Sequence, residues 1–300
     1  MLARSRLIAT AAVAVFASLL AAACAPANPG VTLTPGSAPP SAGALVPDQG
    51  SCTPDQLKTL KADTFTFGTD DPVYDPWYKD DNPTSGQGFE SAVAYAIASR
   101  LGYQYAQVVW VRVPFTAAIQ PGPKTFDADL DEFSITAARS NAVDFSAPYY
   151  DVTQAVITTK SSAAADVHSL SGLRGLKIGA QVGTTSYDAA QSVIKPTQQV
   201  AVYNTNQDAE SALANGQIQA LVVDLPTAFE ITSAKEVPDS TIVGQLPGSG
   251  QPEQFGAVLD KGSPLTPCVS AAVQSMRADG SLANLTNQWL TQAGSAPVLQ

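Results

Sequence analysis

Residues 126–150 gather side-chain types that suit the binding of a charged ligand. Apolar residues alternate with aspartates over positions 126–131, which is the period-two pattern of a strand with one buried face. A polar turn with Ser134 follows, and Arg139 lies within one helical turn of it. A guanidinium binds a carboxylate through two parallel charge-assisted hydrogen bonds, and nearby hydroxyl and amide donors can satisfy its other lone pairs. We therefore predict a carboxylate-binding turn; the alternative is a weak surface pair between Arg139 and Asp144.

Two further candidate contacts follow predicted strands in the second half of the chain. A short apolar run over 176–180 is followed by Gln181, Thr184 and Thr185, at the predicted start of a helix. Helix N-termini expose unpaired N–H groups and a partial positive charge, which favour an anion. Asp224 follows a later strand, and its carboxylate suits an ammonium group. Simple capping of helices by Thr184 and by Asp224 is the alternative explanation for both features.

The spacing of apolar residues predicts the strands and helices that position these side chains. The strand predicted over 64–67 ends at a loop with Asp70, Asp71 and Tyr74. Ligands of open α/β sheets bind beyond the carboxyl ends of the strands, so this loop is a candidate wall of the site. Apolar residues at every fourth position over 89–101 predict an amphipathic helix that ends at a glycine. The other elements are a strand over 108–115, a helix over 206–215, a strand over 219–223 and two helices after residue 264.

The composition is that of an ordinary globular protein. A chain of 300 residues, 45% hydrophobic and 14% charged, is long enough for one or two domains with a sizeable core. The net charge of −10 argues against nucleic acid as a partner, because that affinity depends on basic patches. A single histidine, His168, and the absence of two cysteines at the close spacing of metal ligands leave no recognisable metal site, and we expect no cofactor.

The N-terminus has the features of an export signal. Basic residues precede an apolar, alanine-rich run over 7–23, so we predict a signal peptide over residues 1–23. The run ends in LLAAAC, which resembles a lipoprotein processing site and predicts that Cys24 is lipidated; the alternative is ordinary secretory cleavage nearby. Residues 24–51 are rich in proline, glycine and serine, so we expect a disordered tether. The protein should therefore lie outside the cytoplasm, anchored by lipid to the cell membrane.

Two further cysteines lie near the ends of the predicted folded part. Cys52 stands at its start and Cys268 near its end. Because an exported protein enters an oxidising compartment, we expect them to form a disulfide, and the alternative is two separately buried thiols. Such a bond would join the two ends of the folded chain.

Several motifs, in this order, resemble the family 3 extracellular solute-binding proteins, the capture components of amino-acid ABC importers. The resemblance rests on DDPVYDPW, DADLDEFSITAAR, VDFSAPYY, LRGLKIGAQ, QALVVDLPTA, EQFGAVLDKGSPL and ADGSLANLTNQWL. It implies a two-lobed α/β fold of the type II periplasmic-binding-protein class, with a discontinuous first lobe and a two-crossover hinge. The first lobe would comprise 52–154 and 248–300, and the second 155–247. A ligand that contacts both lobes would stabilise the closed form.

The resemblance also implies roles for individual residues. Arg139, with the hydroxyls of the two polar turns, would bind the α-carboxylate of an amino acid, and Asp224 its α-ammonium group. The whole implied ligand-binding set is Asp71, Tyr74, Phe115, Glu132, Ser134, Arg139, Gln181, Thr184, Thr185 and Asp224. One extra residue precedes Asp71, so Asp70 is an alternative to it, and Trp77 is expected to be either a core residue or a second wall.

The predicted function is capture of an amino acid and its delivery to the permease of an ABC importer, by a monomer. Asp131, Glu132 and Asp71 favour a basic side chain, Gln181 also suits a glutamine-like one, and an acidic or apolar side chain is the remaining alternative. Asp131 can point away from the site, because residues in a strand alternate between its two faces. Two other functions are alternatives. One is an enzyme on the same fold, dehydratase-like or murein-cleaving, and the other is a sensor that feeds a receptor. The single histidine stands in no recognisable Ser-His-Asp motif, which favours binding over catalysis.

Overall fold

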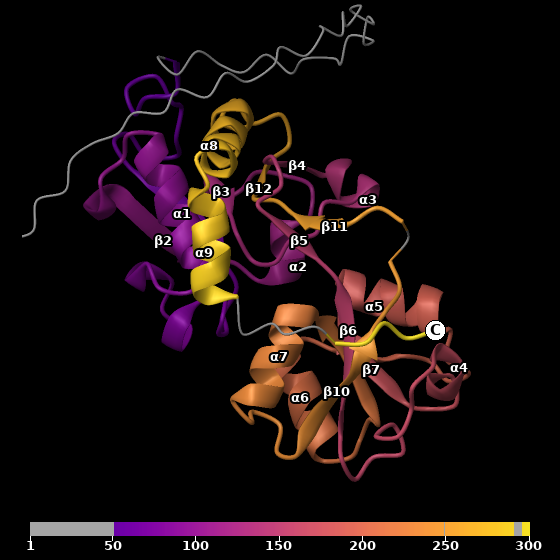
Figure 1. Ribbon diagram of the computed structural model, residues 1–300. Coiled ribbons are helices and arrows are strands. Elements are labelled where there is room, and N and C mark those ends of the chain that lie inside the picture. Colours follow the sequence, from indigo (N-terminus) through magenta and orange to yellow (C-terminus); the bar gives the residue numbers. More distant parts are fainter. Residues whose placement is uncertain (1–50, 249, 291–295) are drawn as a thin grey trace, which may run out of the picture. The chain divides into compact units, whose positions relative to one another are not determined.

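The computed structural model describes residues 51–248, 250–290 and 296–300, and Figure 1 labels its helices and strands. The predicted signal peptide over 1–23, Cys24 and the predicted tether up to residue 50 lie outside the described residues. Within the described part of the chain, no helix is both long and apolar enough to span a membrane. The described residues form two α/β lobes, each built on a five-stranded sheet.

The sheet of the first lobe has the strand order β2-β1-β3-β12-β4. Its strands are β1 (Phe65–Thr69), β2 (Val108–Arg112), β3 (Ala128–Asp129), β4 (Val143–Phe145) and β12 (Val258–Asp260). β1 pairs in parallel with β2 and β3, whereas β12 is antiparallel to β3 and β4. The carboxyl ends of β1, β2 and β3 therefore lie at the same edge of the sheet, and the loops that follow them meet there.

Three long helices of the first lobe pack against one another. They are α1 (Phe89–Arg100), α8 (Thr266–Ala278) and α9 (Ser281–Trp289). Two short helices, α2 (Phe115–Ala118) and α3 (Ala137–Ser140), follow β2 and precede β4 respectively. The period-four residues predicted for α1 are buried, and Val93 and Ile97 have no exposed surface. They share a core with Phe65 and Phe67 of β1.

The sheet of the second lobe has the order β10-β6-β9-β7-β8. Its strands are β6 (Gln154–Thr159), β7 (Ile178–Gln181), β8 (Ala201–Tyr203), β9 (Ala220–Asp224) and β10 (Ser240–Gln245). Its helices are α4 (Leu170–Leu173), α5 (Thr185–Ala189), α6 (Asn206–Ala214) and α7 (Leu225–Ser233). Alternate residues of β6 enter two different cores, Val156 one and Ile157 the other, so the sheet is buried on both faces.

The chain passes between the lobes through a two-stranded antiparallel sheet. Its strands are β5 (Tyr150–Val152), which leads into β6, and β11 (Glu253–Phe255), which leads from the second lobe back to β12. Figure 1 lets the reader follow both passages. Because Gln154 begins β6 and Glu253 begins β11, each passage places a polar side chain beside the loops that form the candidate site.

The last residues of the chain do not lie on the first lobe, to which the prediction assigned 248–300. Residues 296–300 lie against the second lobe, where Val298 forms a parallel bridge with Gln245. Leu299 is 2% exposed and belongs to a core of that lobe. A side chain on Gly244 would meet the carbonyl oxygen of Pro297 at 2.6 Å, so glycine allows this close approach. The chain therefore ends on the second lobe, after helices α8 and α9 of the first.

Cys52 and Cys268 form a disulfide, as predicted. It joins the start of the described chain to the first turn of α8. Both sulfur-bearing residues are buried in the core of the first lobe. The bond therefore fastens the N-terminal segment of the fold to the helices near its C-terminus.

The segment over 126–131 is buried on both faces, which the alternating pattern did not predict. Asp127 and Asp129 are 4% and 0% exposed. The carboxylate of Asp127 accepts hydrogen bonds from the backbone N–H groups of Leu60 and Thr66, both at 2.7 Å, which explains how one of these charges is tolerated. The strand predicted over 108–115 is also shorter, because β2 ends before Pro114 and α2 begins at Phe115.

Candidate functional site

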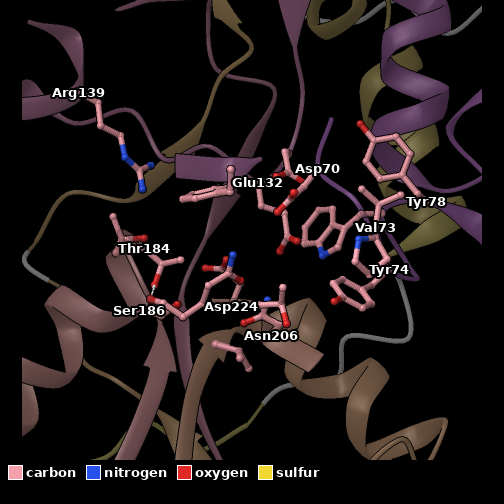
Figure 2. Close-up of a pocket in the computed structure, with 18 residues that line it drawn as sticks. Asp70, Val73, Tyr74, Tyr78, Glu132, Arg139, Thr184, Ser186, Asn206 and Asp224 are labelled. Atoms are coloured by element: carbon pink, nitrogen blue, oxygen red, sulfur yellow. Dashed lines mark hydrogen bonds between the residues drawn. The ribbon is translucent and has the colours of Figure 1, made fainter. Parts of the chain in front are cut away.

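A cleft lies between loops of the two lobes, and Figure 2 shows the side chains around it. It contains eight of the ten predicted ligand-binding residues, whereas Asp71 and Ser134 do not line it. The lining from the first lobe is Asp70, Pro72, Val73, Tyr74, Trp77, Tyr78, Phe115, Asp131, Glu132 and Arg139. The lining from the second lobe is Gln181, Thr184, Thr185, Ser186, Thr205, Asn206, Val223 and Asp224.

The loop after β1 supplies one wall of the cleft. Asp71 is exposed and lies outside the lining, and Asp70, its alternative in the sequence, lines the cleft instead. Tyr74 lines it as predicted, and burial raises the pKa of its phenol to about 12. Trp77 is 1% exposed and packs edge-on against Phe89, so it is a core residue that also reaches the cleft.

Arg139 projects into the cleft from the start of α3. The Thr136 hydroxyl caps this helix by accepting a hydrogen bond from the Arg139 backbone N–H at 3.1 Å. The guanidinium donates to the carbonyl oxygen of Ser134 at 2.8 Å and to that of Gly183 at 2.9 Å. Burial lowers the pKa of this guanidinium, and the nearby Glu253 raises it. The alternative pair with Asp144 is not formed, since Asp144 instead pairs with Lys261.

One aromatic ring packs against the guanidinium, and a second ring packs against the first. The Arg139 guanidinium carbon lies 5.4 Å from the centre of the Phe115 ring. Phe115 in turn stacks on Phe133 with ring centres 4.8 Å apart. Such a cation–π contact restricts the guanidinium without using its N–H donors. The donors that do not bind the two carbonyl groups stay available for a ligand.

The hydroxyls predicted to bind a carboxylate have different surroundings. Ser134 is 1% exposed, and its hydroxyl donates to Glu253 Oε1 at 2.5 Å and lies 3.2 Å from the Thr185 hydroxyl. The Thr184 hydroxyl accepts from the Tyr187 backbone N–H at 3.2 Å, so it caps α5, as the alternative interpretation held. Thr184 and Thr185 nevertheless both line the cleft.

Gln154 connects the hinge to the cleft, a role that sequence reasoning missed. Its amide nitrogen donates to Asp224 Oδ1 at 2.6 Å and contacts both carboxylate oxygens of Glu253 at 3.2 and 3.1 Å. Its amide oxygen accepts from the Ser186 hydroxyl at 2.7 Å. Asp224 itself makes no side-chain cap to α7, so the capping alternative is not what orients it. No local sequence signal marks Gln154, because its partners come from distant segments.

The lining of the cleft is strongly acidic. Among the described residues that line it, four are acidic and Arg139 alone is basic. Burial, followed by repulsion from neighbouring carboxylates, raises the pKa values of Asp131, Glu132 and Asp224 well above their ordinary range. A cationic group in the cleft would relieve this repulsion, whereas an additional carboxylate would increase it.

Glu132 connects the two lobes through a chain of hydrogen bonds. Its Oε2 accepts from the Thr227 hydroxyl of α7 at 3.0 Å, and that hydroxyl accepts from the Trp77 indole nitrogen at 2.9 Å. We call Trp77, Thr227 and Glu132 the cross-lobe triad. The backbone N–H of Glu132 donates to Glu90 Oε1 at 2.8 Å, and the Tyr149 hydroxyl donates to the same oxygen. Burial raises the pKa of Glu90 to about 7.

Comparison with known proteins identifies the family. Residues 65–292 match the bacterial extracellular solute-binding proteins, family 3. The chain belongs to this family, and its fold is the two-lobed fold of periplasmic amino-acid-binding proteins. Within the described residues, no group of three or more histidine, cysteine or acidic side chains is arranged to hold a metal ion.

Individual relatives share about a quarter of their residues with this chain. The arginine-binding periplasmic protein of Mannheimia haemolytica is 28% identical over 73% of this chain and 89% of the relative. The ABC transporter glutamine-binding protein GlnH of Bacillus subtilis is 28% identical over 78% of this chain and 80% of the relative. A solved ancestral arginine-binding protein bound to arginine has a TM-score of 0.63 and 29% identity, covering 75% of this chain and 97% of that one.

Proposed function

We propose that this protein captures an α-amino acid outside the cytoplasm and delivers it to an ABC importer. The observation that carries the proposal is the placement of Arg139 and Asp224 on opposite lobes of one cleft. A guanidinium suits the α-carboxylate, and a carboxylate suits the α-ammonium group. The relatives support the same class of ligand, because they are arginine-binding and glutamine-binding proteins.

We propose a basic amino acid as the preferred ligand, ahead of a glutamine-like one. The main-chain groups of an amino acid would neutralise Arg139 and one of the four lining carboxylates. Of the other lining carboxylates, Asp70 and Asp131 would then remain near the ligand side chain. A cationic side chain between the rings of Tyr74 and Phe115 lowers the energy of these charges, whereas a glutamate side chain raises it.

Transport would depend on closure of the lobes around the ligand. A ligand that contacts both lobes stabilises the closed form by its differential affinity for it. The importer then recognises that form. A lipid group on Cys24 would keep a monomeric protein at the membrane, and residue 24 lies outside the described part of the chain. We propose binding rather than catalysis, and delivery to an importer rather than to a receptor.

A thermal-shift panel tests this function. L-arginine, L-lysine, L-glutamine and L-glutamate are each added to the purified protein, because a ligand that binds the native state raises the melting temperature by mass action. We expect the largest rise with L-arginine or L-lysine and a smaller one with L-glutamine. A response to L-glutamate alone would overturn the basic preference, and no response to any amino acid would overturn the proposed function.

A further inference from the structure

We propose that Glu132 is a second ammonium-binding carboxylate, which acts with Asp224 so that the ligand's α-ammonium group is bound by one carboxylate from each lobe. The inference rests on the proposed function and adds a residue to its ammonium site. Both side chains line the cleft, Glu132 from the first lobe and Asp224 from the second, and Figure 2 shows them there.

The backbone of Glu132 places its side chain in an unusual way. Its φ of 54° lies in the left-handed region, which glutamate adopts rarely and at a conformational cost. The hydrogen bond from its N–H to Glu90 Oε1 stabilises this conformation. Strained residues of this kind concentrate at ligand-binding sites, where the surrounding structure fixes them. The strained backbone of Glu132 therefore favours a functional role for its carboxylate.

The cross-lobe triad fixes the direction of each hydrogen bond at this carboxylate. An indole N–H is only a donor and an ionised carboxylate only an acceptor. The Thr227 hydroxyl must therefore accept from Trp77 and donate its single proton to Glu132 Oε2. Trp77 and Thr227 are 1% and 4% exposed, so water does not compete easily for these bonds.

The second oxygen of Glu132 is left for a ligand. Oε1 has no hydrogen-bond partner among the described residues. On the other lobe, Gln154 orients Asp224 by donating to its Oδ1. An ammonium group carries three N–H donors, enough to bind Glu132 Oε1 and Asp224 together. Thr227 and Gln154 thus act as positioning residues, one for each carboxylate.

This arrangement makes closure depend on a cation. Glu132 and Asp224 lie close enough to repel each other when both are ionised, and Glu90 and Glu253 add to the negative charge around them. Arg139 is the cation that acts on Asp224 from the described lining. An ammonium group between the two carboxylates converts repulsion across the cleft into attraction. Ligands without this group should therefore stabilise the closed form less.

The test pairs a charge-removing variant with a ligand that lacks the ammonium group. Glu132→Gln keeps an oxygen that can accept from Thr227 but removes the negative charge. Calorimetry measures L-arginine and its des-amino analogue, 5-guanidinopentanoate, and L-glutamine with its des-amino analogue as a second pair. We expect Glu132→Gln to weaken binding of the amino acid about tenfold or more and to change binding of the analogue by less than about twofold.

Two further variants separate a role at the ligand from a structural one. Thr227→Val removes the positioning hydroxyl. It should weaken binding of the amino acid by about threefold to tenfold and leave binding of the analogue unchanged. Glu230→Gln, on the same helix as Thr227 but outside the lining, is the matched control and should leave both affinities unchanged. Circular dichroism confirms folding of each variant, and if Glu132→Gln fails to fold, Thr227→Val carries the test.

The outcomes distinguish this inference from the proposed function. If the unmodified protein binds an amino acid and the affinity of Glu132→Gln is within about twofold of it, Glu132 does not bind the ammonium group and the proposed function stands. Equal weakening of amino acid and analogue would also overturn the inference, because the lost contact would then not involve the ammonium group. If the unmodified protein binds no amino acid, the proposed function fails and this inference fails with it.

Discussion

At the scale of single residues, the unusual property of this protein is the number of carboxyl groups held around one cleft. Glu90 is fully buried behind the lining, and its Oε2 has no hydrogen-bond partner among the described residues. Such a group is stable when it is protonated, because an ionised carboxylate loses its hydration on burial. The acidic residues therefore tie both the stability and the ligand binding of the protein to pH.

Glu90 should make the free energy of unfolding fall as pH rises. Its pKa is about 7 in the folded protein and 4.5 for an exposed side chain, so its stabilising effect is complete below pH 4.5 and is lost as pH rises through 7. Between pH 5 and 8, the free energy of unfolding should fall less in Glu90→Gln than in the parent protein, by up to about 3 kcal/mol. Urea unfolding at both pH values measures this, with exposed Asp71→Asn as the control. An equal loss in the Glu90→Gln protein and in the parent would contradict the assignment.

Affinity for a cationic ligand should rise with pH. The pKa values of Asp131, Glu132 and Asp224 are raised in the unliganded protein. A bound cation favours their ionised forms and lowers these values, so binding releases protons and tightens as pH increases. Calorimetry with L-arginine from pH 5 to 8, in two buffers of different ionisation enthalpy, should show proton release. A flat profile without proton release would count against carboxylates as the ligand's partners.

At the scale of elements, local patterns in the sequence predicted the long helices and the edge of the sheet where the site lies. Helices α1 and α6 match the ranges predicted from apolar spacing, and β9 ends at Asp224 as expected. The periodicity failed where both faces of a strand are buried, as at Asp129 in β3. Successive side chains there still point to opposite faces of the sheet, but both faces are covered by protein. A polar residue in this strand therefore does not indicate a solvent-exposed face.

The parts of the site that the sequence did not predict depend on contacts between distant segments. Thr227 receives its role from Trp77 and Glu132, which lie 150 and 95 positions away in the chain. Gln154 acquires its role through Asp224 and Glu253 in the same way. Neither residue has a local pattern that distinguishes it from an ordinary polar residue. Eight of the ten residues implied by the family resemblance line the cleft, whereas Thr227 and Gln154 were found only in the structure.

The C-terminal segment should stabilise the second lobe through one buried side chain. Leu299 is 2% exposed and Val298 is 56% exposed, although they are neighbours in the chain. Backbone hydrogen bonds also link this segment to Gln245 and Leu170. Leu299→Ala should lower the free energy of unfolding by about 2–4 kcal/mol, and Val298→Ala by no more than about 0.5. Denaturant unfolding of both variants decides this, and equal small effects would mean that the segment does not contribute to the core.

At the scale of the whole molecule, side-chain hydrogen bonds link the hinge to the cleft. Gln154 and Glu253 lie at the two passages between the lobes. Gln154 donates to Asp224 in the lining of the cleft, and it also contacts Glu253. The cross-lobe triad adds a link from the opposite wall. A ligand that binds Arg139 and Asp224 therefore acts directly on the groups that hold the lobes together. We propose that these links couple capture of the ligand to closure of the lobes.

If the two lobes bind the two charged ends of an amino acid, replacing Arg139 by alanine should abolish most of the affinity, which calorimetry on Arg139→Ala measures. The ligand is the amino acid that gives the largest thermal shift with the parent protein. Loss of a bidentate charged contact in a buried site should weaken binding at least about hundredfold. The control is Arg277→Ala, an exposed arginine that donates to Pro148 and lies outside the cleft, and it should bind like the parent. Binding by Arg139→Ala within about threefold of the parent would contradict the account.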